Sequence, residues 1–243
     1  MRMNLTVLIL ILISFLIASL PRTQAAEMLP GIQTYLSARA QEFNQIPAAR
    51  RDLLNQLVQK MQTQQQSHPP VQLVFICTHN SRRSHFGQVW SAAAAAYYHV
   101  EGIRTFSGGT EATACNIRTM DALRRAGLTV TMTDTMTEES QNPHYLVKYA
   151  KDLPPAVCYS KVYDDTANPQ QDFIAILTCS DADTKCPVVI GARARFPVTY
   201  EDPKAADGTP EESAQYDARS RQIAREMMYV FSRITWTVPA ESK

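Results

Sequence analysis

The sequence predicts an α/β fold, in which a parallel sheet carries helices on both faces. From residue 71 onward, short apolar runs alternate with segments of helical periodicity, and this alternation is typical of a parallel sheet covered by helices. The chain has 243 residues, of which 45% are hydrophobic, so it can bury one sizeable core. We therefore expect one main domain over residues 71–236.

The first 26 residues have the pattern of a signal peptide. Arg2 precedes an uncharged apolar run, Leu5 to Leu20, and a stretch of small residues follows at Thr23–Ala26. We expect cleavage after Ala25 or Ala26, export to the periplasm, and no stable membrane span in the mature chain. An uncleaved anchor is the alternative, because the run approaches the roughly 20 residues that cross a bilayer.

Residues 27–70 are expected to form a helical extension and a linker. Two amphipathic patterns occur between Ile32 and Met61, separated by Pro47. The polar stretch from Gln62 to Pro70 ends in paired prolines, which are typical of a linker. We expect this extension to pack on the core without a chemical role.

The first part of the main domain alternates strand and helix. The expected order is a strand at Val71–Ile76, a helix at about 83–99, a strand at Ile103–Ser107, a helix at Asn116–Ala126 and a strand at Thr129–Thr133.

The second part begins with two segments rich in strand-forming residues, His144–Tyr149 and Val157–Tyr163, which we interpret as a β-hairpin inserted at the sheet edge. A buried strand is expected at Phe173–Leu177. The last helix is expected to begin at the capping box Thr209–Glu212, which has a proline at the first helical position.

The loop between the first strand and the first helix is the strongest functional signal. Cys77 ends the apolar run, and Arg83 and Ser84 open the helical segment. A helix N-terminus presents unpaired N–H groups and the positive end of its dipole, so an oxyanion is the expected ligand. Arg83 can pair two oxygens of such an anion, and the same field favours the thiolate of Cys77 as a nucleophile.

Composition argues against several other classes of function. The net charge is +1, with 24 basic and 23 acidic residues and no basic stripe, so nucleic acid is not an expected partner. The histidines are scattered and no close cysteine pair of the zinc-finger type occurs, so we expect no metal site and no cofactor.

Two further cysteines follow the predicted strand at Phe173–Leu177. Cys179 and Cys186 are seven positions apart, at the carboxyl end of that strand. Ligands bind at this edge of a doubly wound sheet, so we expect the pair to lie near Cys77. Because an exported protein meets an oxidising environment, a static disulfide between the two is the alternative.

Three pieces of the chain together resemble a known family. They are Cys77-x5-Arg83-Ser84, the run from Cys179 to Pro187, and Glu201-Asp202-Pro203. They are similar to those of the thioredoxin-coupled arsenate reductases, in the low-molecular-weight protein tyrosine phosphatase superfamily, over roughly residues 71–234. The phosphatases generally lack the second piece, so the resemblance favours the reductases and implies their parallel-sheet fold.

The resemblance implies a relay of three cysteines. Cys77 would attack the arsenic of bound arsenate while Asp202 protonates the departing oxygen. Cys179 would attack Cys77 and release arsenite, and Cys186 would move the disulfide to Cys179–Cys186 for reduction by a thioredoxin-like partner.

The resemblance also implies which residues hold the oxyanion. Asn80 and Ser107 match positions that support the loop, whereas His79 stands where relatives usually have glycine. Lys204 replaces an aromatic residue that is usual in the phosphatases. The expected oxyanion-binding residues are Thr78, His79, Asn80, Ser81, Arg82, Arg83 and Ser84.

Two other functions remain open from the sequence. A phosphomonoester hydrolase would form a phosphocysteine at Cys77, with Arg83 on the equatorial oxygens and Asp202 as the acid, and would bind phosphate instead of arsenate. A non-catalytic oxyanion-binding protein would keep Cys179 and Cys186 as a fixed disulfide.

Overall fold

The structure is a computed structural model that describes residues 26–133, 141–185 and 188–236. The predicted signal peptide before Ala26 lies outside the described residues, as do Cys186 and Pro187. Within the described ranges, no helix combines the length and the apolar character needed to cross a membrane.

A four-stranded parallel sheet forms the centre of the fold, as the alternating pattern predicts. Its strands are β1 (Val71–Cys77), β2 (Ile103–Gly109), β6 (Phe173–Leu177) and β7 (Ala192–Phe196), in the order β2-β1-β6-β7. The inner strands β1 and β6 are almost wholly buried, which is why they are continuous apolar runs in the sequence. The edge strand β7 has no such run because Arg193 and Arg195 alternate with its apolar residues, and the sequence reading missed it.

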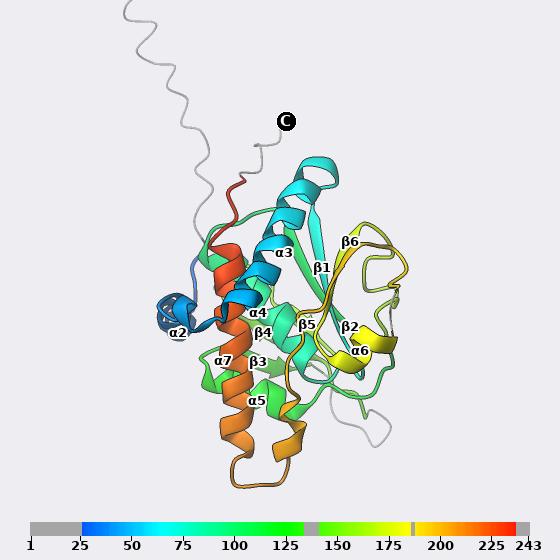
Figure 1. Ribbon diagram of the computed structural model, residues 1–243. Coiled ribbons are helices and arrows are strands. Elements are labelled where there is room, and N and C mark those ends of the chain that lie inside the picture. The colour runs from blue at the N-terminus through cyan, green and yellow to red at the C-terminus, as the bar shows by residue number, and fades with distance from the viewer. Residues whose placement is uncertain (1–25, 134–140, 186–187, 237–243) are drawn as a thin grey trace, which may run out of the picture.

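The two faces of the sheet are covered unequally. Figure 1 shows α2 (Pro30–Ala40), α3 (Ala48–Ser67) and α7 on one side of the sheet and α6 on the other. The first side, with α4 (Arg83–Tyr97), α5 (Ile117–Arg125) and α7 (Glu212–Phe231), contains the larger buried cluster. On the second side a smaller cluster lies under α6 (Ser180–Lys185) and the neighbouring loops. The prediction of helices on both faces is therefore confirmed.

A separate antiparallel sheet contains the predicted hairpin. It consists of β3 (Thr129–Met132), β4 (Tyr145–Lys148) and β5 (Ala156–Cys158), in that order. The expectation that the strand at Thr129–Thr133 continues the parallel sheet was wrong, because β3 pairs with β4 instead. Three of its four residues are exposed, whereas a strand inside a parallel sheet is buried on both faces.

The helical extension is part of the main core. It consists of α2 (Pro30–Ala40), the short 3-10 helix η1 (Phe43–Gln45) and α3 (Ala48–Ser67). Ile32, Leu36, Leu54 and Leu57 are fully buried in the same cluster as the inner face of the sheet. Helix α3 contacts β1 and α7, so the extension forms an outer layer on the helical side of the sheet.

The last helix begins slightly later than the capping box predicts. Asp202 caps the short 3-10 helix η2 (Pro203–Ala206), and α7 begins at Glu212. The expected start at Pro210 was wrong by two residues. The reciprocal bonds of a capping box between Thr209 and Glu212 do not form. Thr209 Oγ1 instead accepts from the Glu211 N–H, Glu212 Oε2 accepts from the Gly208 N–H, and the Glu212 N–H donates to the Thr209 carbonyl.

Candidate functional site

The candidate site lies at the carboxyl ends of β1 and β6, where ligands bind in open parallel sheets. The loop of residues 78–82 leaves β1 and enters α4 at Arg83. Backbone N–H groups from beyond β2 hold it: Thr110 donates to the Cys77 carbonyl at 3.1 Å, and Glu111 to the Thr78 carbonyl at 2.9 Å. The loop is thus fixed from outside, and the first turn of α4 is directed at whatever the loop holds.

The thiol of Cys77 has one directed polar contact among the described residues. Its sulfur lies 3.1 Å from Ser84 Oγ, and only 3% of the residue is exposed. Ser84 Oγ also accepts from Asn80 Nδ2 at 2.9 Å, so the single hydrogen of the Ser84 hydroxyl is available to the sulfur. A hydroxyl donor at this place stabilises the charge of a thiolate.

Asn80 makes the turn of the loop. Its φ is 45°, in the left-handed region that few residues other than glycine and asparagine adopt. Its Oδ1 accepts from the Lys161 N–H at 2.9 Å while its Nδ2 reaches Ser84. The sequence reading put the unusual backbone conformation or a changed path at His79; the described backbone has its positive φ at Asn80 instead.

His79 faces outward from the loop. Its ring pairs with the Glu111 carboxylate at 3.0 Å on the surface, and its carbonyl accepts from Ser160 Oγ and Thr113 Oγ1. Ser81 Oγ donates to the Ala114 carbonyl. In this arrangement, the side chains of His79 and Ser81 fasten the loop to its surroundings.

Arg83 and Asp202 are brought together, and they pair with each other. Arg83 Nη2 donates to Asp202 Oδ2 at 2.7 Å, and Nη1 donates to the Tyr200 carbonyl at 3.0 Å. Arg83 Nε is buried without a hydrogen-bond partner among the described residues. Asp202 Oδ1 accepts from the Lys204 N–H, so the carboxylate also has the ordinary role of a turn residue.

Arg82 belongs to a second polar group that the sequence reading missed. Its Nε donates to Tyr216 Oη at 3.0 Å, and Tyr216 donates in turn to Asp207 Oδ1 at 2.8 Å. Burial is the main cause that raises the pKa of Tyr216 to about 12, so the phenol stays protonated. Only the helix periodicity of α7 marked Tyr216 in the sequence, and it does not distinguish a polar anchor from a core aromatic.

Cys179 lies beside the loop, at the end of β6. Its sulfur is 3.5 Å from Thr78 Oγ1 and accepts from the Ala182 N–H at 3.3 Å, and the residue is 1% exposed. Thr78 directly follows Cys77, so the two cysteines occupy neighbouring positions at one sheet edge. Both are free thiols, as are Cys115 and Cys158. Cys186 lies outside the described residues.

The structure places Ser107, a predicted support of the loop, on β2. Ser107 is fully buried on β2 opposite Phe75, and its hydroxyl has no hydrogen-bond partner within the described residues. The described part of the chain contains no group of three or more histidine, cysteine or acidic side chains that could hold a metal ion.

A buried pair, His85 and Cys115, lies behind the loop and carries no predicted role. His85 Nε2 is 3.2 Å from the Tyr159 carbonyl, which can only accept, so this nitrogen carries the hydrogen. Burial is the main cause that lowers the pKa of His85 to about 4, and burial also raises the pKa of the Cys115 thiol well above its usual value. Neutral imidazole and protonated thiol make this pair a structural contact at 3.5 Å rather than a second nucleophile.

Comparisons with known proteins find similar solved structures only. No family model matches the chain, and no curated protein matches it. A low-molecular-weight phosphotyrosine phosphatase from Vibrio cholerae O395 is 12% identical, with a TM-score of 0.43 over 67% of this chain and 94% of that one. An arsenate reductase from Archaeoglobus fulgidus is 16% identical, with a TM-score of 0.37 over 63% of this chain and 98% of that one.

A third similar structure is a thioredoxin-dependent arsenate reductase from Corynebacterium glutamicum. It is 16% identical, with a TM-score of 0.33 over 81% of this chain and 80% of that one. At these identities and TM-scores, the likenesses assign neither a family nor an activity to this chain. The functional argument therefore rests on the geometry around Cys77.

Proposed function

We propose that this chain reduces arsenate to arsenite through a cysteine relay that begins at Cys77. The observation that carries the proposal is the position of Cys179, whose buried sulfur lies 3.5 Å from the hydroxyl of the loop residue Thr78. A phosphatase needs only the first cysteine, whereas a reductase needs a second thiol within reach of it.

In the first step, the Cys77 thiolate attacks the arsenic atom of the bound anion. A sulfur–arsenic bond forms, an arsenic–oxygen bond breaks, and the departing oxygen leaves as water. When the anion binds, the Arg83 guanidinium releases the Asp202 carboxylate and bonds an oxygen of the anion instead. Asp202, now without its cation, can carry the proton that the leaving oxygen takes.

In the second step, the Cys179 thiolate attacks the sulfur of Cys77. The electron pair of the sulfur–arsenic bond passes to arsenic, which leaves as arsenite, and a Cys77–Cys179 disulfide forms. Cys186 then attacks Cys179 and frees Cys77. A dithiol partner of the thioredoxin class reduces the resulting Cys179–Cys186 disulfide and is itself oxidised.

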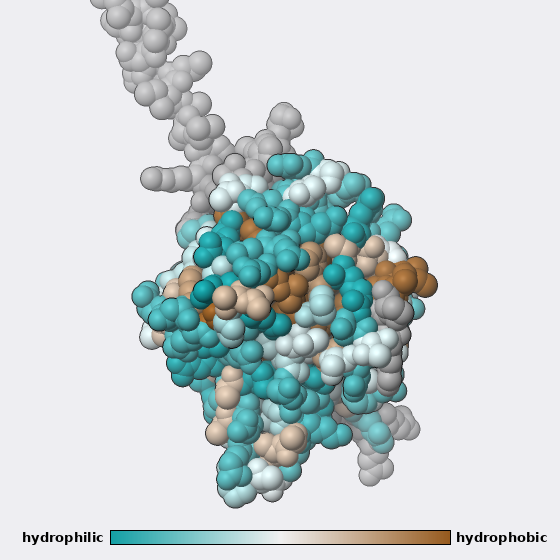
Figure 2. Space-filling model, in the orientation of Figure 1, coloured by the Kyte–Doolittle hydropathy of each residue, from teal (hydrophilic) through white to brown (hydrophobic). Residues whose placement is uncertain are grey.

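The surface beside the relay offers such a partner an apolar contact. Val188 and Ile190 are 74% and 78% exposed, and they lie two and four positions after Cys186 in the chain. Figure 2 shows a largely hydrophilic face with a hydrophobic patch at the edge on the side of α6. Because the chain carries a signal-peptide pattern, we propose that this partner is an exported dithiol protein.

A phosphomonoester hydrolase is the second candidate, and the pair of Arg83 and Asp202 favours it. A phosphate clamp and an acid lie at the mouth of the loop at 2.7 Å from each other, and neither depends on Cys179. Cys77 would then form a phosphocysteine that water hydrolyses.

Arsenate-dependent NADPH oxidation, coupled to thioredoxin and its reductase, separates the two candidates. We expect turnover by the reduced chain and none by Cys179→Ser. Hydrolysis of an aryl phosphate that survives the same substitution, without arsenate reduction in either protein, would assign the site to the hydrolase.

A further inference from the structure

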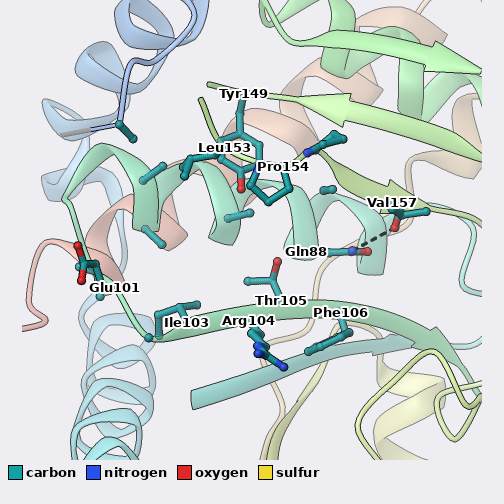
Figure 3. Close-up of a pocket in the computed structure, with 18 of the residues that line it drawn as sticks. Gln88, Glu101, Ile103, Arg104, Thr105, Phe106, Tyr149, Leu153, Pro154 and Val157 are labelled. Carbon is teal, nitrogen blue, oxygen red and sulfur yellow. Dashed lines mark hydrogen bonds between the residues drawn. The ribbon is translucent and has the colours of Figure 1, made fainter. Parts of the chain in front are cut away.

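A second cavity lies away from Cys77, between α4, β2 and β5. Its volume is about 1140 Å³, and no residue of the loop at 77–84 lines it. Figure 3 shows Tyr149, Leu153 and Pro154 on one side and Ile103, Thr105 and Phe106 of β2 on the other. Ala92, Ala95 and Ala96 of α4 also line it, and their short side chains leave the space open.

The backbone of β2 is unpaired where it borders this cavity. The Gly102 carbonyl accepts from Val71 of β1, so the even-numbered residues of β2 turn their backbone groups to β1 and the odd-numbered ones turn away. At the far end, Gly109 uses its outward groups to bond Lys161 and Tyr163. The outward N–H and C=O groups of Ile103 and Thr105 have no hydrogen-bond partner within the described residues.

A buried cation lies at the end of the cavity where β2 meets the segment from Lys161. Lys161 lines the cavity and is 6% exposed, and its ammonium lies 4.3 Å from the centroid of the Tyr159 ring. Among the described residues no carboxylate forms an ion pair with Lys161, and the acidic group that acts on it is Asp165, from beyond ion-pair distance. Burial is the main cause that lowers the pKa of Lys161, and an anion beside it would remove this cost.

Two buried amide oxygens border the same cavity. Gln88 Oε1 and Asn168 Oδ1 have no hydrogen-bond partner among the described residues, although both side chains are at least 95% buried. In Figure 3 the amide nitrogen of Gln88 bonds the Val157 carbonyl, which leaves its oxygen free to accept. A matching ligand therefore supplies N–H donors, an anionic group and an apolar body.

We propose that this cavity binds an extended peptide of a partner protein, which adds to β2 as a strand and places its C-terminal carboxylate against the Lys161 ammonium. A peptide has the N–H and C=O groups that pair with Ile103 and Thr105, and a simple apolar acid has neither. Lys161 lies at the carboxyl end of β2, so the peptide runs parallel to β2.

The test uses a labelled peptide, Val-Thr-Val-Ala-Val, with a free carboxyl end, and its amidated twin. Binding to the full chain is followed by fluorescence anisotropy, and amide hydrogen exchange is measured over residues 103–107. We expect the free acid to bind about tenfold tighter than the amide, which corresponds to about 1.4 kcal/mol, and to slow exchange at Ile103 and Thr105.

Lys161→Met should reduce binding of the free acid to the level of the amide, and Lys60→Met, on α3, should leave it unchanged. If Lys161→Met does not fold, Ala92→Leu provides the second test, because it fills the space without touching the ammonium and should weaken both peptides. Equal affinities for acid and amide, or binding without slower exchange at Ile103 and Thr105, would overturn the proposal. Binding of decanoate without binding of either peptide would also overturn it, and would assign the cavity to small acids.

Discussion

A single hydroxyl hydrogen links the Cys77 sulfur to the turn of its loop. Ser84 bridges the sulfur and the Asn80 amide, and Asn80 bridges Ser84 and the Lys161 backbone. The chain of contacts joins the proposed nucleophile to a residue with a left-handed backbone conformation. The shape of the loop and the hydrogen bond to the Cys77 sulfur therefore both depend on the Asn80 side chain.

Asn80→Ala tests this dependence against Asn80→Gly. Both substitutions remove the two side-chain hydrogen bonds. Leaving their buried partners unpaired lowers the free energy of unfolding by about 1–3 kcal/mol in both variants. The left-handed backbone lowers the free energy of unfolding of the alanine variant by about 1 kcal/mol more, because glycine adopts this conformation without strain. We expect urea denaturation to give a free energy of unfolding lower for the alanine variant by about that difference, and an alanine variant as stable as the glycine variant would refute the role of φ.

Arg83→Lys tests the planar clamp. A lysine keeps the charge but cannot hold two oxygens of a tetrahedral anion in one plane. Loss of one such donor lowers kcat/KM for arsenate by about a hundredfold. The matched control is Arg124→Lys, an exposed arginine paired with Asp121, for which kcat/KM should stay at the wild-type value. Equal kinetics for the two variants would remove Arg83 from the site.

At the residue scale, the sequence indicated which residues meet at the loop better than it indicated their contacts. Cys77, Arg83 and Asp202 were chosen from short motifs, and the structure brings Arg83 and Asp202 together at the loop. The pairing of these two with each other, the outward His79 and the bond from Arg82 to Tyr216 depend on residues far away in the sequence. A motif does not contain that information.

At the scale of elements, β2 and the loop after β1 approach so closely that one glycine is required. A Cβ on Gly109 would lie 2.2 Å from the Glu111 carbonyl oxygen and 2.8 Å from the Asn80 nitrogen. Both are backbone atoms, so neither can move away by a change of side-chain rotamer. The close approach is what allows Thr110 and Glu111 to bond the loop.

Gly109→Ala should therefore damage both stability and activity. We expect a loss of more than about 2 kcal/mol in the free energy of unfolding, together with lower activity, because the backbone of the loop must shift. The control is Gly208→Ala, where a Cβ meets nothing within 4 Å and only the positive φ of 78° is strained, at about 1 kcal/mol. Similar losses at the two positions would contradict the close-approach argument.

Periodicity predicted the buried elements and failed at the exposed ones. The strands β1 and β6 and the helices α3, α4 and α7 carry long apolar patterns, so their existence could be predicted. The edge strand β7 and the exposed strand β3 have mixed patterns, and their partners are set by tertiary packing. Sheet membership, in contrast to strand formation, is not a local property of the sequence.

At the scale of the whole molecule, the N-terminal helices are connected to the site through a buried ion pair. Arg50 of α3 bonds Glu226 of α7 at 3.0 Å and the Thr199 carbonyl at 3.1 Å. Tyr200 donates to the same Glu226, and its carbonyl accepts from Arg83. The outer helical layer thus helps to position the segment that bonds the Arg83 side chain.

The buried His85 should make the stability of the whole fold depend on pH. Its pKa is lowered to about 4 in the folded chain, against about 6.5 when unfolded, so the folded state binds fewer protons. The stabilisation is complete above about pH 6.5 and is lost as the pH falls toward about 4, by at most about 1.4 kcal/mol per pH unit. Urea denaturation over this range should show the slope.

His85→Gln should flatten this slope, because an amide can keep the bond to the Tyr159 carbonyl without taking up a proton. His68→Gln, at the exposed end of α3, is the control and should retain the slope of the wild-type protein. An unchanged slope in His85→Gln would assign the acid sensitivity to other groups.

The central claim is that the sulfurs of Cys77 and Cys179 react with each other after arsenate binds. Its most direct test is mass spectrometry of reduced Cys186→Ser after a single exposure to arsenate, with phosphate as the control anion. The account predicts a Cys77–Cys179 disulfide and one arsenite released per chain, with neither product in phosphate. Cys77 and Cys179 recovered as free thiols, with arsenate unchanged, would contradict the relay.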